Sequence, residues 1–144
     1  MRIRDYVKQK GLLSIEVLFR GKVYTINLYE ELQINTQKIN DELKEQPTSY
    51  AFLSTLNQHF IKRAENAERV MEKYKSMSIK KLYEKNGNVS LAKELYAAEP
   101  LYDKAMKDFN AAKDQRNILS MAVKSFEQRA FILQTLSANT RQRN

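Results

Sequence analysis

The sequence has no cysteine, no tryptophan, one histidine, three glycines and two prolines among its 144 residues. The lack of cysteine excludes disulfides and thiolate metal sites, which fits a reducing compartment, so we expect a cytoplasmic protein. The scarcity of glycine and proline favours helices over a fold rich in sheet or loop. No segment approaches the roughly 18 apolar residues of a membrane span. We expect no signal peptide either, because no apolar stretch follows Met1–Arg4.

Positive charge is in excess, with 25 lysines and arginines against 17 acidic residues and a net charge of +8. Such a balance suits a polyanionic partner, either nucleic acid or an anionic membrane surface. The alternative is that the charge keeps a helical surface soluble. A chain of this length can bury one core, so we predict a single domain with an N-terminal element at residues 1–27 and a helical region at 28–144.

Residues 1–27 have the pattern of a small β-hairpin. Ile15, Val17 and Phe19 alternate with polar neighbours, and Val23–Ile26 is rich in β-branched and aromatic residues. The turn is expected at Gly21. A lone hairpin is only marginally stable in water, so it must pack on the helices as a cap or on a neighbouring subunit.

Helix signals divide the rest of the chain. Asn27–Glu30 has the spacing of a capping box, which predicts a helix that stops before Pro47. Pro47 is expected to open a second helix, which runs to about Lys85 and ends at Gly87. A short helix at 90–98, a last helix at about 101–138 and a frayed basic tail at 140–144 complete the prediction.

Apolar residues recur in steps of three and four along both long helices, which is typical of a heptad seam. The first seam comprises Leu53, Leu56, Phe60, Arg63, Ala67, Val70, Tyr74 and Met77. The second comprises Tyr102, Ala105, Phe109, Ala112, Arg116, Leu119, Val123, Phe126, Ala130 and Leu133. We therefore predict a mainly α fold: a long antiparallel helical hairpin with an additional N-terminal helix and the small β-hairpin. The small alanines in the seams imply a modest core, so we expect self-association.

Arg63 and Arg116 take seam positions where a large apolar residue is expected. Each could extend its guanidinium to water over apolar surface. Alternatively, they could fix the helix register or bind a partner, in which case each needs acceptors.

Groups for catalysis or metal binding are sparse. His59 is the one histidine, and Leu56 stands where a Glu-x-x-His metal motif needs its carboxylate. Glu65, Glu68 and Glu72 share one helical face, but nearby lysines and arginines can pair with them. The three glycines are isolated, so there is no phosphate-binding loop. We expect no enzymatic activity, no metal and no cofactor.

Basic residues follow a stripe on the first long helix. The stripe comprises Lys62, Arg69, Lys73, Ser76 and Lys80, continues to Lys81 and Lys85, and has Tyr74 and Tyr83 interleaved. Lysine and arginine can follow a phosphate backbone, and tyrosine can stack on unpaired bases. The alternative is a solvated face whose lysines pair with nearby glutamates. No recognition motif for base pairs is present, which favours single-stranded or nonspecific binding.

The order of segments over residues 47–136 resembles the phage UvsY family of recombination mediators. The similar stretches are Pro47-x-x-Tyr50-Ala51, Glu65-x-x-Glu68, Ser78–Tyr83, the Gly87 turn, Ser90-x-x-Lys93-Glu94, Glu99–Tyr102 and Arg129-x-x-x-Leu133. The N-terminal hairpin has no counterpart in that pattern.

The resemblance implies a helical homo-oligomer, ring-like in the family, that binds single-stranded DNA in the cytoplasm, which would be the host's for a phage protein. It also implies partners, a RecA-like recombinase and the single-strand-binding protein that this recombinase replaces. The implied DNA contacts are Lys80, Lys81 and Tyr83, with Lys73, Lys75 and Lys85 beside them. The competing hypothesis is a protein-binding or scaffolding module, such as a phage-encoded host inhibitor or assembly factor, with no nucleic-acid role.

Overall fold

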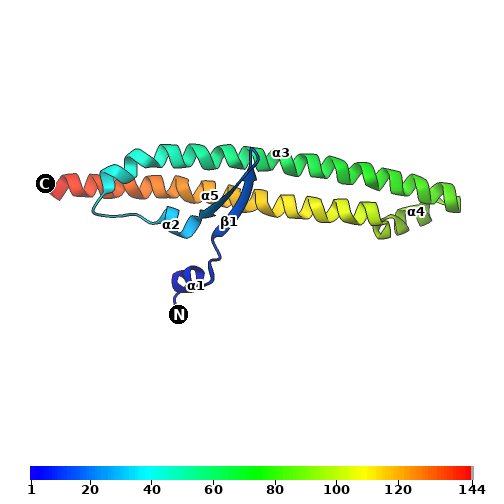
Figure 1. The fold of residues 1–144 in the computed structure, drawn as a ribbon, viewed down its shortest axis with the longest axis horizontal. Coiled ribbons are helices and arrows are strands. Elements are labelled where there is room, and N and C mark those ends of the chain that lie inside the picture. The colour runs from blue at the N-terminus through cyan, green and yellow to red at the C-terminus, as the bar shows by residue number, and fades with distance from the viewer. Residues whose placement is uncertain (144) are drawn as a thin grey trace. The chain divides into compact units, whose positions relative to one another are not determined.

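The computed structural model describes residues 1–143 and confirms a mainly α fold with an N-terminal β-hairpin (Figure 1). The elements in chain order are α1 (Ile3–Lys10), β1 (Ser14–Phe19), β2 (Lys22–Asn27), α2 (Leu28–Leu32), α3 (Ile39–Asn86), α4 (Val89–Leu95), the 3₁₀ turn η1 (Tyr96–Ala98) and α5 (Pro100–Arg143).

The chain divides into two compact units, each built around part of α3 and part of α5. The terminal unit combines Met1–Leu56 with the segment that starts at Met121. The central unit is Asn57–Ser120. Within each unit the two helices run antiparallel, because early residues of the α3 segment meet late residues of the α5 segment. In the central unit, for example, Asn57 bonds to Ser120 while Met71 packs on Tyr102 and Ala105.

The β-hairpin of the terminal unit forms as its sequence predicts. β1 and β2 pair antiparallel through a two-residue turn in which Arg20 and Gly21 have φ of 51° and 76°, as tight hairpin turns require. Val17 points inward and is 3% exposed, whereas Leu18, on the other face, is 50% exposed. The rings of Tyr24 and of Phe52 in α3 pack edge-on, with their centroids 6.1 Å apart. The inner face of the hairpin is therefore covered by the chain's own helices.

The predicted helix before Pro47 is wrong in extent. Asn27 does cap α2, since its side chain accepts from the Glu30 N–H at 3.2 Å, but α2 ends at Leu32. The helix breaks because the Leu32 and Gln33 carbonyls accept hydrogen bonds from Arg129, at 3.4 and 2.8 Å. The connection then turns locally, with the Asn35 side chain accepting from a main-chain N–H two residues on.

The helix predicted to open at Pro47 begins eight residues earlier, at Ile39, and continues through the proline. Proline removes one helical hydrogen bond, yet contacts on both sides of it hold the helix. Gln46 donates to the Phe126 carbonyl at 2.7 Å, and the Tyr50 hydroxyl donates to Glu127 at 2.8 Å. Tertiary bonds to α5 thus outweigh the local preference.

The predicted end of α3 is confirmed. Gly87 has φ of 64° and its N–H bonds to the Tyr83 carbonyl at 2.7 Å, the left-handed C-cap that glycine favours. Asn88 then caps α4 by accepting from the Leu91 N–H at 3.2 Å. The predicted end of α5 is wrong: the helix continues past Ala138 to Arg143, through most of the expected tail, and Asn144 lies outside the described residues.

The heptad seam predicted for α3 holds as far as Phe60, and of its later positions Ala67 and Tyr74 are half-buried. The other later positions, Arg63, Val70 and Met77, are exposed. The positions that turn inward are Leu53, Leu56, Phe60, Ala64, Ala67, Met71, Lys75, Ser78 and Leu82, of which Ala67 and Lys75 are half-buried. These steps of three, four and four form an 11-residue repeat, which corresponds to about 3.67 residues per turn. An undistorted α-helix has about 3.6 residues per turn, so it follows this repeat more closely than a heptad repeat of about 3.5.

The seam predicted for α5 is closer to the structure. From Tyr102 to Leu119 its positions are buried or half-buried. Farther along, Ala122 and Arg129 are buried in place of Val123 and Ala130, which are half-buried. The shift by one residue turns Arg129 into the core of the terminal unit.

Candidate nucleic-acid interface

The six residues predicted to contact DNA all lie in the last turns of α3, within the central unit. Residues 73–85 contain five lysines and one glutamate, a net charge of +4. Lys73, Lys80, Lys81, Tyr83 and Lys85 are exposed, and Lys75 is half-buried. The structure places four of the lysines in two groups on different sides of the helix, and Lys85 lies in its last turn.

The first group belongs to an outward-facing row that we call the basic ridge: Lys62, Arg69, Lys73 and Lys80, with Ser76 among them, all exposed. Lys73 and Lys80 each follow a buried residue, Met71 and Ser78, by two positions. Two helical positions correspond to about 200° of rotation, so the ridge faces away from the core.

No cation of the basic ridge pairs with a carboxylate within 4.0 Å in the described part of the chain. Arg69 donates instead to the neutral Asn66 amide at 2.6 Å. The predicted alternative, in which nearby glutamates pair with these lysines, is therefore not what the geometry shows. The positive charge of the ridge stays available to a partner.

The second group points toward α4 and η1. Lys81 pairs with Glu99 at 3.3 Å, and the Lys75 ammonium lies 5.3 Å from the centre of the Tyr96 ring. Tyr96 in turn packs edge-on against Tyr102 at 5.0 Å between centroids. Lys75 and Lys81 thus fasten the segment before α5 onto α3.

Tyrosine is less evenly placed than the sequence suggests. Tyr83 is 47% exposed and stands three residues after Lys80, next to the basic ridge. Tyr74 instead packs against the cluster of Met71 and Tyr102. The exposed apolar residues that flank the ridge are Val70 and Met77, at 47% and 51%. The heptad pattern predicted that both residues face inward. The 11-residue spacing of the buried positions is the signal that separates these two exposed residues from the core of α3.

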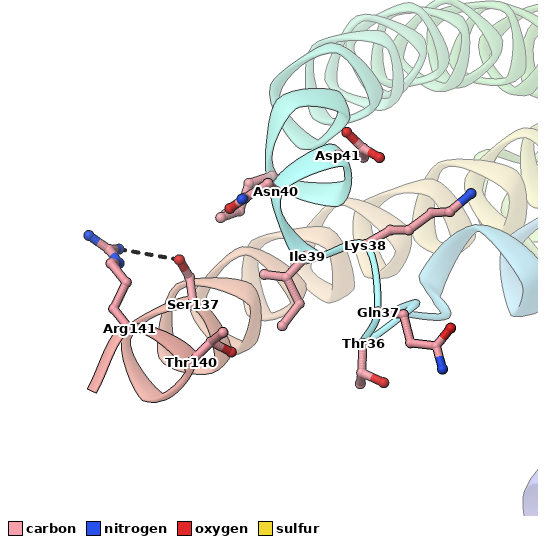
Figure 2. A pocket seen from close by; sticks show the side chains of 10 residues that line it. Thr36, Gln37, Lys38, Ile39, Asn40, Asp41, Ser137, Thr140 and Arg141 are labelled. Atoms are coloured by element: carbon pink, nitrogen blue, oxygen red, sulfur yellow. Dashed lines mark hydrogen bonds between the residues drawn. The ribbon is translucent and has the colours of Figure 1, made fainter. Parts of the chain in front are cut away.

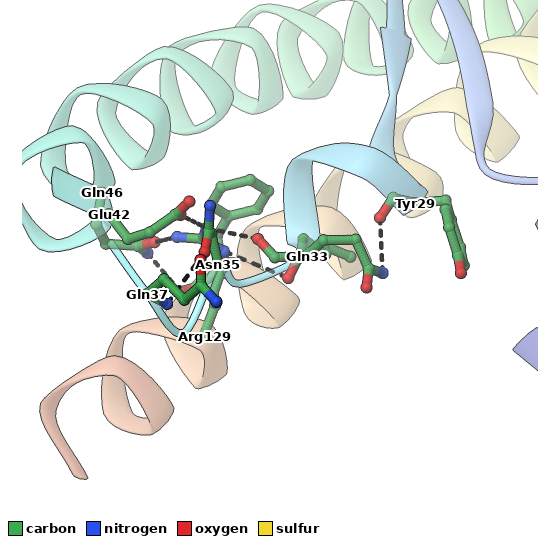
Figure 3. Close-up of polar contacts among 9 residues, drawn as sticks. Tyr29, Gln33, Asn35, Gln37, Glu42, Gln46 and Arg129 are labelled. Atoms are coloured by element: carbon green, nitrogen blue, oxygen red, sulfur yellow. Dashed lines mark hydrogen bonds and ion pairs between the residues drawn. The ribbon is translucent and has the colours of Figure 1, made fainter. Parts of the chain in front are cut away.

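Arg129 is the buried arginine that the seam analysis did not identify. It is 7% exposed and lies in a polar cluster of the terminal unit (Figure 3). Besides the two carbonyls that end α2, it donates to the Gln46 side chain at 2.7 Å and forms an ion pair with Glu42. It sits three residues after Phe126 and four before Leu133, spacing that places it on their face. The cluster has a structural role, because its contacts join α5 to the end of α2 and to the first turns of α3.

The two predicted seam arginines behave differently. Arg63 is exposed, and its guanidinium lies 5.8 Å from the centre of the Phe60 ring. Arg116 is half-buried and bonds to Asn117 at 3.5 Å. Arg63 therefore adopts the first of the two predicted arrangements, in which its aliphatic stem covers apolar surface and its guanidinium extends to water.

A polar hollow lies beside the first turn of α3 and the last turns of α5 (Figure 2). Arg141 donates to the Ser137 hydroxyl at 3.2 Å on one wall. Lys38 and Arg141 share the lining with Asp41. This mixture of charges favours neither an anion nor a cation, and we assign no ligand to the hollow.

Residues 1–143 contain no group of three or more histidine, aspartate or glutamate side chains placed to hold a metal ion. His59 is exposed and packs edge-on against Phe60, with ring centroids 5.4 Å apart. None of the helices described is both long enough and apolar enough to cross a membrane.

No family model, no curated protein and no solved structure matches this chain. The resemblance to the UvsY family therefore stays a prediction from the residue pattern. What the protein does has to be inferred from its own surfaces.

Proposed function

We propose that the protein is an oligomeric single-stranded DNA-binding recombination mediator that acts without catalysis, metal or cofactor. The observation that carries the proposal is the basic ridge, where four cations lie on one exposed face of α3 without a carboxylate partner in the described chain. From Lys62 to Lys80 the ridge is about 27 Å long at 1.5 Å per residue. That length spans several phosphates of a strand.

The neighbours of the ridge favour a single strand over a duplex. Val70, Met77 and Tyr83 are exposed beside the cations. In a single strand the bases are accessible, so apolar and aromatic side chains can contact their faces while lysines hold the phosphates. A duplex would offer these side chains no base faces.

The mediator role follows from the pattern resemblance combined with self-association. Several copies would present several basic ridges to one strand, and linked weak contacts bind far more tightly than one. A strand held in this way could be passed from a single-strand-binding protein to a RecA-like recombinase in the cytoplasm.

The direct test is the binding of a fluorescent single-stranded oligonucleotide, followed by anisotropy at moderate salt. The variant with Lys73, Lys80, Lys81 and Lys85 changed to glutamate should lose binding and keep its helical circular dichroism. The double variant Lys73→Glu/Lys80→Glu isolates the ridge, since Lys81 also pairs with Glu99. A matched control reverses four exposed lysines elsewhere, Lys22, Lys44, Lys104 and Lys124, and should bind nearly as well as the parent. Equal binding by the quadruple variant and the parent would show that the surface is wrong.

The second candidate function is a protein-binding or scaffolding module. It is favoured by an apolar groove in the terminal unit between Leu43 and Pro47 of α3 and Ala130 and Phe131 of α5. Phe131 is 70% exposed at this groove, as residues that anchor a protein partner often are. Absence of oligonucleotide binding at micromolar protein would favour this function over the first.

A further inference from the structure

The first helix buries none of its residues against the rest of the described chain. α1 is eight residues long, none of them buried, and Ile3 and Tyr6 are 85% and 47% exposed. Isolated helices shorter than about 12–15 residues are marginal in water. An eight-residue helix of this kind needs an external surface to stay folded.

α1 is also strongly basic on one flank. Residues 1–10 carry four cations and one aspartate, a net side-chain charge of +3. Ile3, Tyr6 and Val7 share one face of the helix with Lys10, while Arg4 and Lys8 lie one turn apart beside it. Arg4 also contacts the exposed Asp5 of the same helix at 3.8 Å. The helix therefore presents an apolar face with a cationic edge.

A surface of the opposite character lies elsewhere in the terminal unit. Two adjoining hollows share Glu31, Ser49 and Phe126. The first is apolar, with Ile26, Phe52 and Leu53 in its lining. The second is acidic and lined by Glu30, Glu31, Glu42 and Glu45. Residues 28–46 carry five acids and two lysines, a net charge of −3. We call the two hollows together the acidic groove.

We propose that α1 of one chain docks in the acidic groove of a second copy, with Ile3 and Tyr6 on the apolar lining and Arg4 and Lys8 beside Glu31 and Glu45. Glu42 is already paired with Arg129, whereas Glu31 and Glu45 are exposed and form no ion pair within 4.0 Å among the described residues. The contact identifies the surface for the self-association on which the proposed function rests.

In this structure α1 does not occupy the groove of its own chain, since none of its residues is buried and none lines either hollow. Gly11–Leu13 joins α1 to β1. The Leu13 carbonyl accepts from the Leu28 N–H at 2.9 Å, and the Gly11 carbonyl accepts from the Ser14 N–H at 3.1 Å. With the link in this course α1 lies outside the groove of its own chain, which leaves that groove to a second copy. Since helix and groove are different surfaces, each chain can give one and receive one, which closes a ring or a reciprocal pair.

The test is the mass in solution by size-exclusion chromatography with light scattering. The helix-reversed variant Arg4→Glu/Lys8→Glu and the groove-reversed variant Glu31→Lys/Glu45→Lys should each shift the mass toward the 16.9 kDa of one chain. Each should raise the dissociation constant more than about tenfold, because like charges then face each other. An equimolar mixture of the two variants should restore assembly, since every helix then meets a groove of opposite charge.

The control Lys104→Glu/Lys124→Glu makes the same charge change as the helix-reversed variant at two other exposed positions and should leave the mass unchanged. A parent chain that stays at 16.9 kDa at every concentration would overturn both the docking and the proposed self-association. An assembled parent whose helix-reversed and groove-reversed variants also assemble would overturn the docking alone. Binding of a monomeric parent to anionic phospholipid vesicles through Arg4 and Lys8 would assign α1 to a membrane surface instead. Both reversed variants keep the basic ridge, so a single chain should still bind the oligonucleotide, more weakly than the assembled parent, and complete loss of binding would count against the DNA proposal instead.

Discussion

The terminal and central units use the same two helices but hold them together differently. In the terminal unit α3 and α5 are joined by polar bonds, from Gln46 to the Phe126 carbonyl, from Tyr50 to Glu127 and from Arg129 to Glu42. In the central unit the helices meet through apolar contacts around Met71. Among the described residues of the central unit, the Ser120 hydroxyl of α5 donates a hydrogen bond to the Asn57 side chain of α3 at 3.2 Å.

The difference assigns separate roles to the two units. Buried polar bonds are satisfied in one geometry only, and breaking them is costly, so they fix the register of the two helices within the terminal unit. The apolar contacts of the central unit are less specific, and they lie on the side of α3 opposite to the basic ridge. The terminal unit is held by specific polar bonds, and the central unit carries the proposed binding surface.

The largest expected effect on stability comes from Arg129→Ala. The change leaves Glu42, Gln46 and two main-chain carbonyls without their donor. Removing one member of a buried ion pair costs about 3–5 kcal/mol, and urea denaturation should show this loss. The matched control is Arg63→Ala, an exposed arginine, which should cost less than about 1 kcal/mol. Similar losses for the two variants would remove the distinction between the units.

In the central unit, Met71→Ala should cost about 2 kcal/mol or somewhat more, because it opens a cavity in the apolar cluster. Met77→Ala is the matched control, since Met77 is 51% exposed and its loss should stay within about 0.5 kcal/mol. A larger loss for Met77 than for Met71 would support the heptad seam instead of the 11-residue one. Thermal or urea unfolding of both variants decides between the two.

The fold was predictable where the signal is local. The alternation of Ile15, Val17 and Phe19 and the left-handed glycines Gly21 and Gly87 each act on their neighbours alone, so hairpin and turns were placed correctly. The break after Leu32 depends on Arg129, which is 97 residues away, and no local pattern reveals it.

The seam and the candidate site were predicted only in part. A heptad and an 11-residue repeat coincide over the first turns of the seam and then separate, which is why Val70 and Met77 were assigned inward. Lys73 and Lys80 were placed correctly on one exposed face by their spacing of seven. Lys75 and Lys81 instead contact Tyr96 and Glu99. These residues are 21 and 18 positions away along the chain, so local spacing does not reveal the contacts.

A smaller effect is expected at the turn that ends α3. A Cβ added at Gly87 meets no atom within 4 Å, so Gly87→Ala is strained only by the backbone φ of +64°. The cost should be about 1 kcal/mol, measured by thermal unfolding. Gly87→Asn should cost less, because asparagine tolerates this conformation better than alanine. An equal loss of stability in Gly87→Ala and Gly87→Asn would mean that backbone strain at this position does not determine the loss.

The smallest effect is expected for Tyr50→Phe, which removes one half-exposed bond of the terminal unit. The hydrogen bond to Glu127 raises the pKa of Tyr50 above its ordinary value. The folded state therefore favours the protonated tyrosine, and this stabilisation is fully present below about pH 10 and lost as pH rises through the folded pKa. Stability measured against pH should fall more steeply above pH 10 in the parent than in Tyr50→Phe. Parallel curves would show that the bond does not contribute.

The central claim, that the basic ridge captures single-stranded DNA through its charges, is tested most directly by the salt dependence of oligonucleotide affinity. For single strands the logarithm of the affinity falls with the logarithm of salt concentration by about 0.7 per phosphate neutralised. We predict a steep decline for the parent, and a decline shallower by about 1.4 for Lys73→Glu/Lys80→Glu, which removes two contacts. Equal slopes for the two proteins, or no binding by the parent at low salt, would contradict the account.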